Sequence, residues 1–181
     1  MKEAEVLREG KILIYPTDTI WGIGCDALNV SAIEKVKKIK GRDNTKSFIL
    51  LMRDLDMLKN YVEEIPNEAI KLMQDINEPL TIIYPKAKNL PIEHLSFNQS
   101  IGVRIPKDDF LQTLFEEFPY PIVSSSANFS GQDSPKTFSD IDKNFLEQAD
   151  YVSKRQAEKN ETRHSSLLYL ISESGEIIQL R

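Results

Sequence analysis

Basic side chains gather in one short segment of this chain. Between positions 35 and 46, six lysines and arginines stand against the single acidic residue Asp43, so the segment carries 6 − 1 = +5 while all 181 residues sum to −5. Several cations that converge from a loop suit a polyphosphate, because each can neutralise a different oxygen. The last three, which straddle Gly41 at a predicted helix end, therefore indicate a phosphate site: Lys40, Arg42 and Lys46. The earlier ones are typical of a solvated helix face: Lys35, Lys37 and Lys38.

Hydroxyl and amide side chains form a second group. The run PIVSSSANFSG at 121–131 leaves a predicted strand and supplies hydroxyl, amide and backbone N–H donors at the strand end. Open sheets bind ligands at strand ends, so Ser124, Ser126 and Asn128 are candidate ligand donors. An ordinary serine and asparagine turn is the alternative, and composition alone favours it.

A third group lies in the run YPTDTIWGIGCDA at 15–27. Two threonines and two glycines at a strand-to-strand junction would let a ligand approach the backbone closely. The alternative is a hydrogen-bonded turn, with Trp21 in the core. Neither Asp18 nor Asp26 is a convincing general base, since both residues also suit turns and strand ends.

Composition excludes several classes of protein. One cysteine, Cys25, leaves no intramolecular disulfide and no cysteine-based zinc site, and the two histidines show no ligand spacing. The charged, amphipathic N-terminus is unlike a signal peptide, and no apolar run approaches the roughly 20 residues that span a bilayer. We therefore expect a reduced, cytoplasmic, soluble protein without membrane contact. The net charge of −5 argues against a protein that coats nucleic acid through charge alone.

These groups need elements that position them, and apolar runs alternate with turn residues along the whole chain. The pattern predicts one domain over 1–181 with a mixed sheet and helices on its faces. Ser31 and Glu34 have the spacing of a capping box, and Gly41 would end the helix that begins there. The predicted strands are 11–15, 20–27, 47–52, 80–85, 100–106, 120–126, 149–153, 165–171 and 176–180. The predicted helices are 4–10, 31–40, 54–60, 67–76, 108–118 and 139–148, with a loop over 86–99.

Four motifs in this order resemble the YrdC-like family, and within it the threonylcarbamoyl-AMP synthases of the TsaC type. The motifs are YPTDTIWGIGCDA, KIKGRDNTKSFILL, IGVRIP and VSSSANFSG, and the resemblance runs from about Gly10 to the end of the chain. It implies an α+β (mixed α/β) single domain. A twisted mixed sheet flanked by helices would surround a concave basic cavity.

The resemblance also implies an activity. Similar family members are nucleotidyltransferases that condense L-threonine, bicarbonate and ATP to threonylcarbamoyl-AMP and pyrophosphate. Mg²⁺ would accompany ATP, and no residue is assigned as a metal ligand. The product serves the threonylcarbamoyladenosine modification of tRNA through downstream transfer proteins. Some family members have also been described as binding double-stranded RNA.

Carried over residue by residue, the family's motifs assign a site. The K-x-R motif implies catalytic, electrostatic roles for Lys40 and Arg42. The ATP-binding positions would be Lys40, Arg42, Lys46, Ser100, Ser126, Asn128, Ser134 and Arg181. The threonine-binding positions would be Thr19, Arg104, Ser124 and Ser165. One departure affects the last part of this site, because His164 stands where the family usually has proline.

Three other interpretations stay open at this point. The chain could be a YciO-like paralogue with the same fold and another activity, which the run SFILLMRDLDML resembles. It could be a non-catalytic module that binds double-stranded RNA through the +5 segment. The serine and lysine clusters could also be surface decoration, which their placement on opposite faces of the fold would support.

Overall fold

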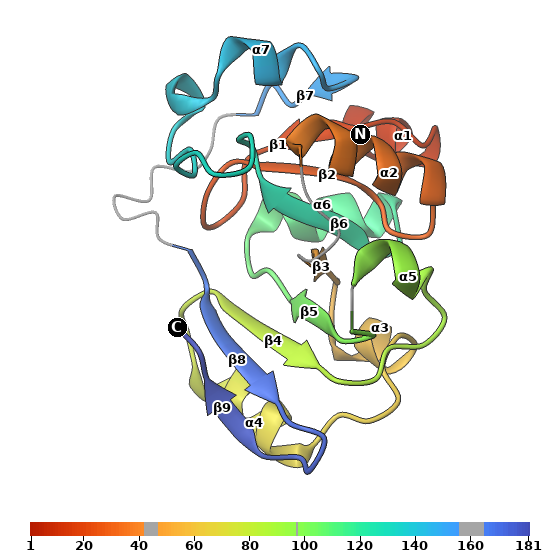
Figure 1. Ribbon diagram of the computed structural model, residues 1–181, viewed down its shortest axis with the longest axis vertical. Helices are drawn as coiled ribbons and strands as arrows, with labels where there is room; N and C mark the ends of the chain where they lie inside the picture. The colour runs from red at the N-terminus through yellow and green to blue at the C-terminus, as the bar shows by residue number, and fades with distance from the viewer. Residues whose placement is uncertain (42–46, 97, 156–164) are drawn as a thin grey trace.

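The computed structural model of the chain describes residues 1–41, 47–96, 98–155 and 165–181. The strands of these residues join one nine-stranded sheet in the order β7-β1-β2-β6-β3-β5-β4-β8-β9. Figure 1 shows the sheet running from β7, near the N-terminus, down to β8 and β9 at the C-terminus. The strands are β1 (Leu13–Tyr15), β2 (Gly22–Asp26), β3 (Ile49–Leu51), β4 (Leu80–Tyr84), β5 (Ile101–Arg104), β6 (Ile122–Ser126), β7 (Tyr151–Val152), β8 (Leu167–Ile171) and β9 (Ile177–Gln179).

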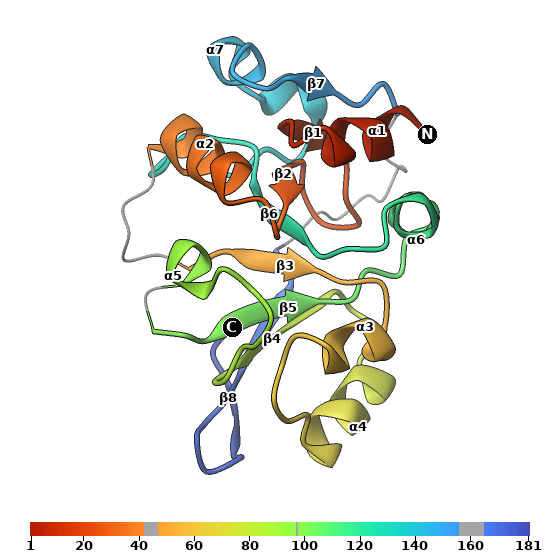
Figure 2. The ribbon, with the colours of Figure 1, turned by 90° about the vertical axis from the view of Figure 1, so that its right-hand side faces the viewer.

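The sheet is mixed, as predicted. The pairs β1–β2, β2–β6, β3–β6, β4–β5 and β8–β9 are antiparallel, whereas β1–β7, β3–β5 and β4–β8 are parallel. Parallel neighbours need crossover connections, and the helices supply them. Figure 2 shows α3 and α4 beside β4 and β5, far from α2 and α7.

The helices match the predicted pattern except in two places. They are α1 (Lys2–Arg8), α2 (Val30–Lys40), α3 (Leu55–Lys59), α4 (Asn67–Asp75), α5 (Ile92–Leu95), α6 (Asp109–Glu117) and α7 (Lys143–Leu146), with a 3₁₀ turn at Phe138–Asp140. The loop predicted over 86–99 contains α5, so that prediction was wrong there. The helix predicted over 139–148 is split, because Ile141 is extended and Asp142 caps a new helix through the N–H of Asn144.

The start of α2 corrects the predicted capping box. Asn29 is the N-cap, and its side-chain oxygen accepts a hydrogen bond from Ala32 N at 3.0 Å. Glu34 instead pairs with Lys37 at 2.9 Å, one turn further along the helix. The predicted end of α2 is confirmed, since Gly41 is its C-cap with a left-handed φ of 59°.

This assignment makes a direct stability prediction. Asn29→Ala should lower the free energy of unfolding by about 1 kcal/mol, because a side-chain acceptor for an otherwise unpaired helix N–H is lost. Ser31→Ala is the matched control and should change it by less than about 0.5 kcal/mol, since Ser31 is exposed. Urea unfolding of the three proteins measures both changes. If Ser31→Ala lowered the free energy of unfolding more than Asn29→Ala, Ser31 rather than Asn29 would be the N-cap, as the capping-box prediction had it.

Strand register divides the sheet into an apolar face and a face that carries the polar site. Ile49 lies opposite Ser124 and Gly102, and Leu51 lies opposite Arg104. Side chains alternate along a strand, so Ser124 and Arg104 project from the same face. The other face presents a continuous buried row of Cys25, Val123, Leu50, Val103 and Ile82.

Candidate active site

A cavity of about 240 Å³ opens on the polar face of the sheet. Its walls come from the turn after β1, from β2, β3, β5 and β6, and from residues just before β8 and just after β9. Seven residues that the sequence assigned to the site line it: Thr19, Arg104, Ser124, Ser126, Ser134, Ser165 and Arg181. The hydroxyl side chains therefore share one cavity with Arg104, and the surface-decoration alternative fails for these seven residues.

Arg104 is the central cation of this cavity. Its side chain is 7% exposed, its Nη1 donates to Thr19 Oγ1 at 2.7 Å, and its Nη2 pairs with Asp18 Oδ1 at 2.9 Å. Its Nε is buried with no hydrogen-bond partner among the described residues. A buried donor without a partner is costly, so this N–H is an orphan that a ligand oxygen could satisfy.

The turn after β1, which contains Thr17 and Asp18, orients Arg104. Thr17 Oγ1 donates to Ile20 O at 2.8 Å and lies 2.9 Å from Thr19 Oγ1. Thr19 N in turn donates to Thr17 Oγ1 at 3.1 Å. Thr17 thus holds Thr19 in place, and Asp18 pairs with Arg104 directly. The sequence signal for these roles is the run YPTDT, in which two threonines flank an aspartate that could pair with an arginine distant in sequence.

Lys40, the last residue of α2, contacts the loop that follows β6. Its side chain is buried, and its Nζ donates to Ser126 O at 2.5 Å and to Asn128 O at 2.9 Å. Its own carbonyl accepts a hydrogen bond from Ser130 N at 2.9 Å. The end of α2 therefore clamps the loop that follows β6 in both directions. The resemblance implied an ammonium facing phosphate, whereas the contacts shown are with backbone carbonyls.

The amide of Asn128 has a defined orientation. Its Nδ2 donates to Phe129 O at 2.9 Å and to Gln132 O at 2.8 Å. Both partners are acceptors, so the nitrogen must face them. Its Oδ1 is buried without a hydrogen-bond partner among the described residues. This oxygen is an unpaired acceptor near the site, whereas Nε of Arg104 is an unpaired donor.

Arg181 is anchored rather than frayed at the end of the chain. Its guanidinium donates to Ser166 O through Nε at 3.2 Å and Nη2 at 3.0 Å. Its backbone pairs with Leu168, and Ser166 Oγ lies 2.7 Å from Thr81 Oγ1. These contacts hold Arg181 and Ser165 at the rim of the cavity.

Of the assigned residues that the structure describes, Lys40, Asn128 and Ser100 are not part of the cavity lining. Ser100 is buried at the start of β5, where its Oγ donates to Asn98 Oδ1 at 2.7 Å. Arg42 and Lys46 lie outside the described residues, as does His164. His94 places its Nδ1 2.8 Å from Glu34 Oε1 and so joins α5 to α2.

Neither a nucleophilic thiol nor a side-chain metal centre emerges from the described part of the chain. Cys25 is fully buried, and burial raises the pKa of its thiol, which keeps it protonated. In the same residues no group of three or more His, Cys, Asp or Glu could hold a metal ion. Among the helices described, none is long and apolar enough to cross a membrane.

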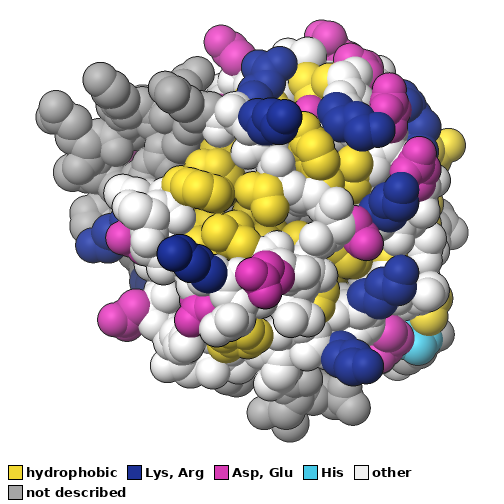
Figure 3. Space-filling model, turned by 90° about the horizontal axis from the view of Figure 1, so that it is seen from above, with side chains coloured by type: hydrophobic (Ala, Val, Ile, Leu, Met, Phe, Trp, Pro, Cys, Tyr) yellow, Lys and Arg dark blue, Asp and Glu magenta, His cyan; other side chains and the backbone are white. Residues whose placement is uncertain are grey.

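The surface charge bears on the nucleic-acid alternative. Figure 3 shows the molecule from above, with lysines and arginines interspersed with aspartates and glutamates around an apolar patch. A protein that tracks a phosphate backbone presents a continuous basic stripe. This face carries no such stripe in the part that the structure describes.

Comparison with known proteins identifies the family. A family model for Sua5, YciO and YrdC, described as telomere recombination, matches residues 5–180. A protein of Pseudoalteromonas translucida named threonylcarbamoyl-AMP synthase is 32% identical over 148 residues, which is 80% of this chain and 79% of that protein.

Solved structures of the same family share the fold of this chain. The crystal structure of Pyrococcus abyssi Sua5 complexed with L-threonine matches with a TM-score of 0.85 at 27% identity, over 99% of this chain and 52% of that one. This chain therefore spans about half the length of that protein. E. coli YciO shares the fold, with a TM-score of 0.82 at 23% identity over 99% of this chain and 86% of that one. The resemblance noted in the motifs is confirmed, and the chain belongs to the Sua5/YciO/YrdC family.

Proposed function

We propose that this chain is a threonylcarbamoyl-AMP synthase, a nucleotidyltransferase that condenses L-threonine, bicarbonate and ATP. The observation that carries the proposal is the buried Arg104, whose Nε has no partner among the described residues and whose cavity is lined by hydroxyl groups. A relative with the same activity in its name and a Sua5 structure holding L-threonine support it.

Arg104 would bind the threonine carboxylate. A guanidinium pairs with a carboxylate through two parallel N–H bonds, and Asp18 and Thr19 leave Nε to start such a fork. Ser124 and Ser165 line the same cavity and could accept or donate to the substrate hydroxyl and amine. Thr19, already bonded to Arg104, would complete this half of the site.

ATP would occupy the end of β6 beside Arg181. Ser126 and Ser134 line the cavity there, and Lys40 holds the backbone on which Ser126 sits. Arg42 and Lys46 follow Lys40 in sequence and would bring further positive charge to the phosphates. Mg²⁺ would enter as the complex with ATP, whose phosphate oxygens are its preferred ligands.

The reaction would proceed by addition and then displacement. The threonine amine adds to bicarbonate with loss of water to give N-carboxy-threonine. A carbamate oxygen then attacks the α-phosphorus of ATP, and pyrophosphate leaves. Both reactants are anions, so cationic groups that neutralise them and fix their approach would supply most of the rate enhancement. Later transfer to tRNA would require other proteins.

The test is an assay of pyrophosphate release. The protein with MgATP, L-threonine and bicarbonate should release pyrophosphate together with threonylcarbamoyl-AMP, identified by mass. Omitting either threonine or bicarbonate should reduce release to background. If pyrophosphate release did not depend on threonine and bicarbonate, or if no pyrophosphate were released, the proposal would be contradicted and the YciO-like alternative favoured.

Arg42 provides a prediction from the motif. Arg42→Ala should lower kcat/KM for ATP by about 100-fold, since a cation that the K-x-R motif assigns to the phosphates is lost. Lys38→Ala, an exposed cation of α2 in the same basic segment, is the control and should stay within about twofold. Steady-state pyrophosphate release measures both. Full activity of the Arg42 variant would remove the K-x-R motif from the mechanism.

A further inference from the structure

A second and larger chamber lies on the other face of the sheet. Its volume is about 700 Å³, and it lies between α4 and the strands β4 and β5. Ile82 lies opposite Val103 in the register, one step from the pair Thr81 and Arg104, so these apolar side chains point away from the active-site cavity. Among the described residues, Ser165 borders both cavities.

The chamber exists because α4 stands away from the sheet. The helix has an apolar side, yet Ala69 is its one buried residue. Met73 on the helix and Ile76 just after it remain half-buried and line the chamber. A volume of about 700 Å³ falls within the range of small-molecule sites, roughly 300–1,000 Å³.

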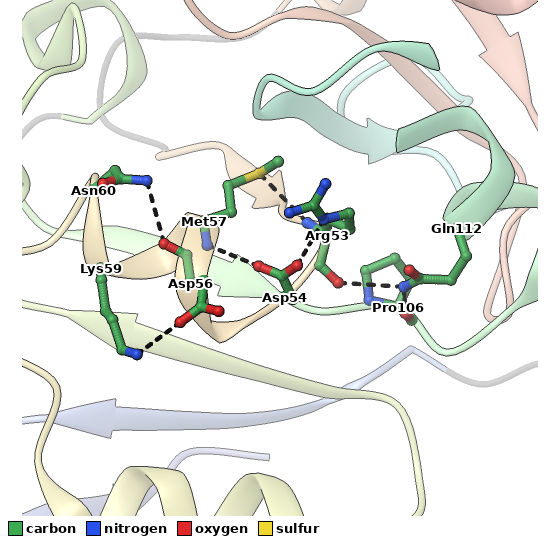
Figure 4. Close-up of polar contacts among 8 residues, drawn as sticks. All are labelled: Arg53, Asp54, Asp56, Met57, Lys59, Asn60, Pro106 and Gln112. Atoms are coloured by element: carbon green, nitrogen blue, oxygen red, sulfur yellow. Dashed lines mark hydrogen bonds and ion pairs between the residues drawn. The ribbon is translucent and has the colours of Figure 1, made fainter. Parts of the chain in front are cut away.

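The walls opposite α4 are held by their own hydrogen bonds. Figure 4 shows Gln112 reaching from α6 to the carbonyls of Pro106 and Arg53, at 2.7 and 3.3 Å. Asp54 caps α3 through Met57 N at 2.8 Å, and Leu58 of that helix lines the chamber. These contacts fix the loop after β5 and the start of α3, which adjoin the chamber.

Two features define what the chamber could bind. The Tyr84 side chain lines it and is 1% exposed, and its hydroxyl has no hydrogen-bond partner among the described residues. The charged lining groups are three carboxylates, Asp18, Glu78 and Asp108, against the ammonium of Lys107, which donates to Ile76 O at 3.0 Å. Asp18 pairs with Arg104 and Asp108 accepts from Leu111 N at 2.9 Å, so the exposed Glu78 is the carboxylate that would meet a ligand cation. The interior is apolar and the mouth is acidic, so it complements an apolar cation and disfavours phosphates.

We propose that this chamber is a second binding site, for a small apolar amine. The hydrocarbon part of the ligand would lie against Ile82, Val103 and Met73, and the ammonium would face the acidic mouth. Tyr84 would hydrogen-bond a polar group of the ligand. Asp18 lines this chamber while it pairs with Arg104 of the other cavity, so the two sites share one ion pair as a wall.

Binding is tested without ATP or threonine, so its outcome is independent of the proposed synthase activity. Three indole probes share the ring and a two-carbon side chain that ends in a cationic, a neutral or an anionic group: tryptamine, tryptophol and indole-3-acetate. Isothermal titration calorimetry should show saturable one-to-one binding of tryptamine, at least about tenfold tighter than that of indole-3-acetate, which corresponds to about 1.4 kcal/mol. Absence of saturable binding, or tighter binding of the anion, would overturn the proposal.

Variants locate the bound probe. Met73→Trp fills the chamber from α4 and should weaken tryptamine binding at least about tenfold, whereas Gln74→Trp on the exposed side of the same helix should not change it. Tyr84→Phe should weaken it severalfold, as expected for one lost hydrogen bond. Unchanged binding to Met73→Trp, or displacement of tryptamine by L-threonine, would place the probe elsewhere and overturn the proposal.

Discussion

Arg104→Lys is expected to remove most of the synthase activity while the protein stays folded. Lysine keeps the charge but loses the planar fork, so it cannot bond Asp18 and Thr19 and still present a second N–H to a carboxylate. The loss should amount to about 2–4 kcal/mol, or roughly 30- to 700-fold in kcat/KM for threonine. Pyrophosphate release at varied threonine and fixed MgATP measures it.

The matched control is Arg53→Lys. Arg53 pairs with a carboxylate as Arg104 does, but its side chain is 41% exposed and lies outside the active-site cavity. Its replacement should change kcat/KM by less than about twofold. If Arg104→Lys retained wild-type kcat/KM for threonine, the carboxylate of the substrate would have to bind elsewhere.

Lys40→Met should lower both stability and activity. Methionine keeps an unbranched apolar stem but leaves the carbonyls of Ser126 and Asn128 without this donor in a buried position. Each buried acceptor left without a partner costs about 1–3 kcal/mol, so we expect the free energy of unfolding to fall by about 2–4 kcal/mol. The loop after β6 would shift, and ATP-dependent pyrophosphate release would fall with it.

Comparing the two readouts separates the possible roles of Lys40. Lys38→Met on the exposed part of α2 is the control and should leave urea unfolding within about 0.5 kcal/mol of wild type. A Lys40→Met protein with wild-type stability but lost activity would mean that the ammonium acts on phosphate directly. Wild-type stability together with wild-type activity would contradict both the structural role of Lys40 in the loop after β6 and its catalytic role in the K-x-R motif.

Local pattern was sufficient for most of the secondary structure. Apolar runs bounded by turn residues predicted the nine strands of the described residues, and Gly41 ended α2 where expected. The errors arose where two local signals compete. Asn29 and Ser31 both suit an N-cap, and only the backbone geometry shows which one accepts from a helix N–H. Asp140 and Asp142 likewise both favour capping, and together they split the predicted helix.

The sequence by itself determined the chemistry of the site. The basic segment, the serines of β6 and the threonines of the turn after β1 were recognisable by residue type and spacing, and their motifs identified the family. Residue type limits what a side chain can donate, accept or neutralise, whatever surrounds it.

Only the tertiary structure decided what those side chains contact. Lys40 bonds the backbone 86 positions later, and Arg104 bonds Thr19 across 85 positions. Asp18 looked like a turn residue and proved to be the partner of Arg104. Such pairings depend on strand order and register, which bring β2, β6, β3 and β5 side by side, and no local spacing encodes them.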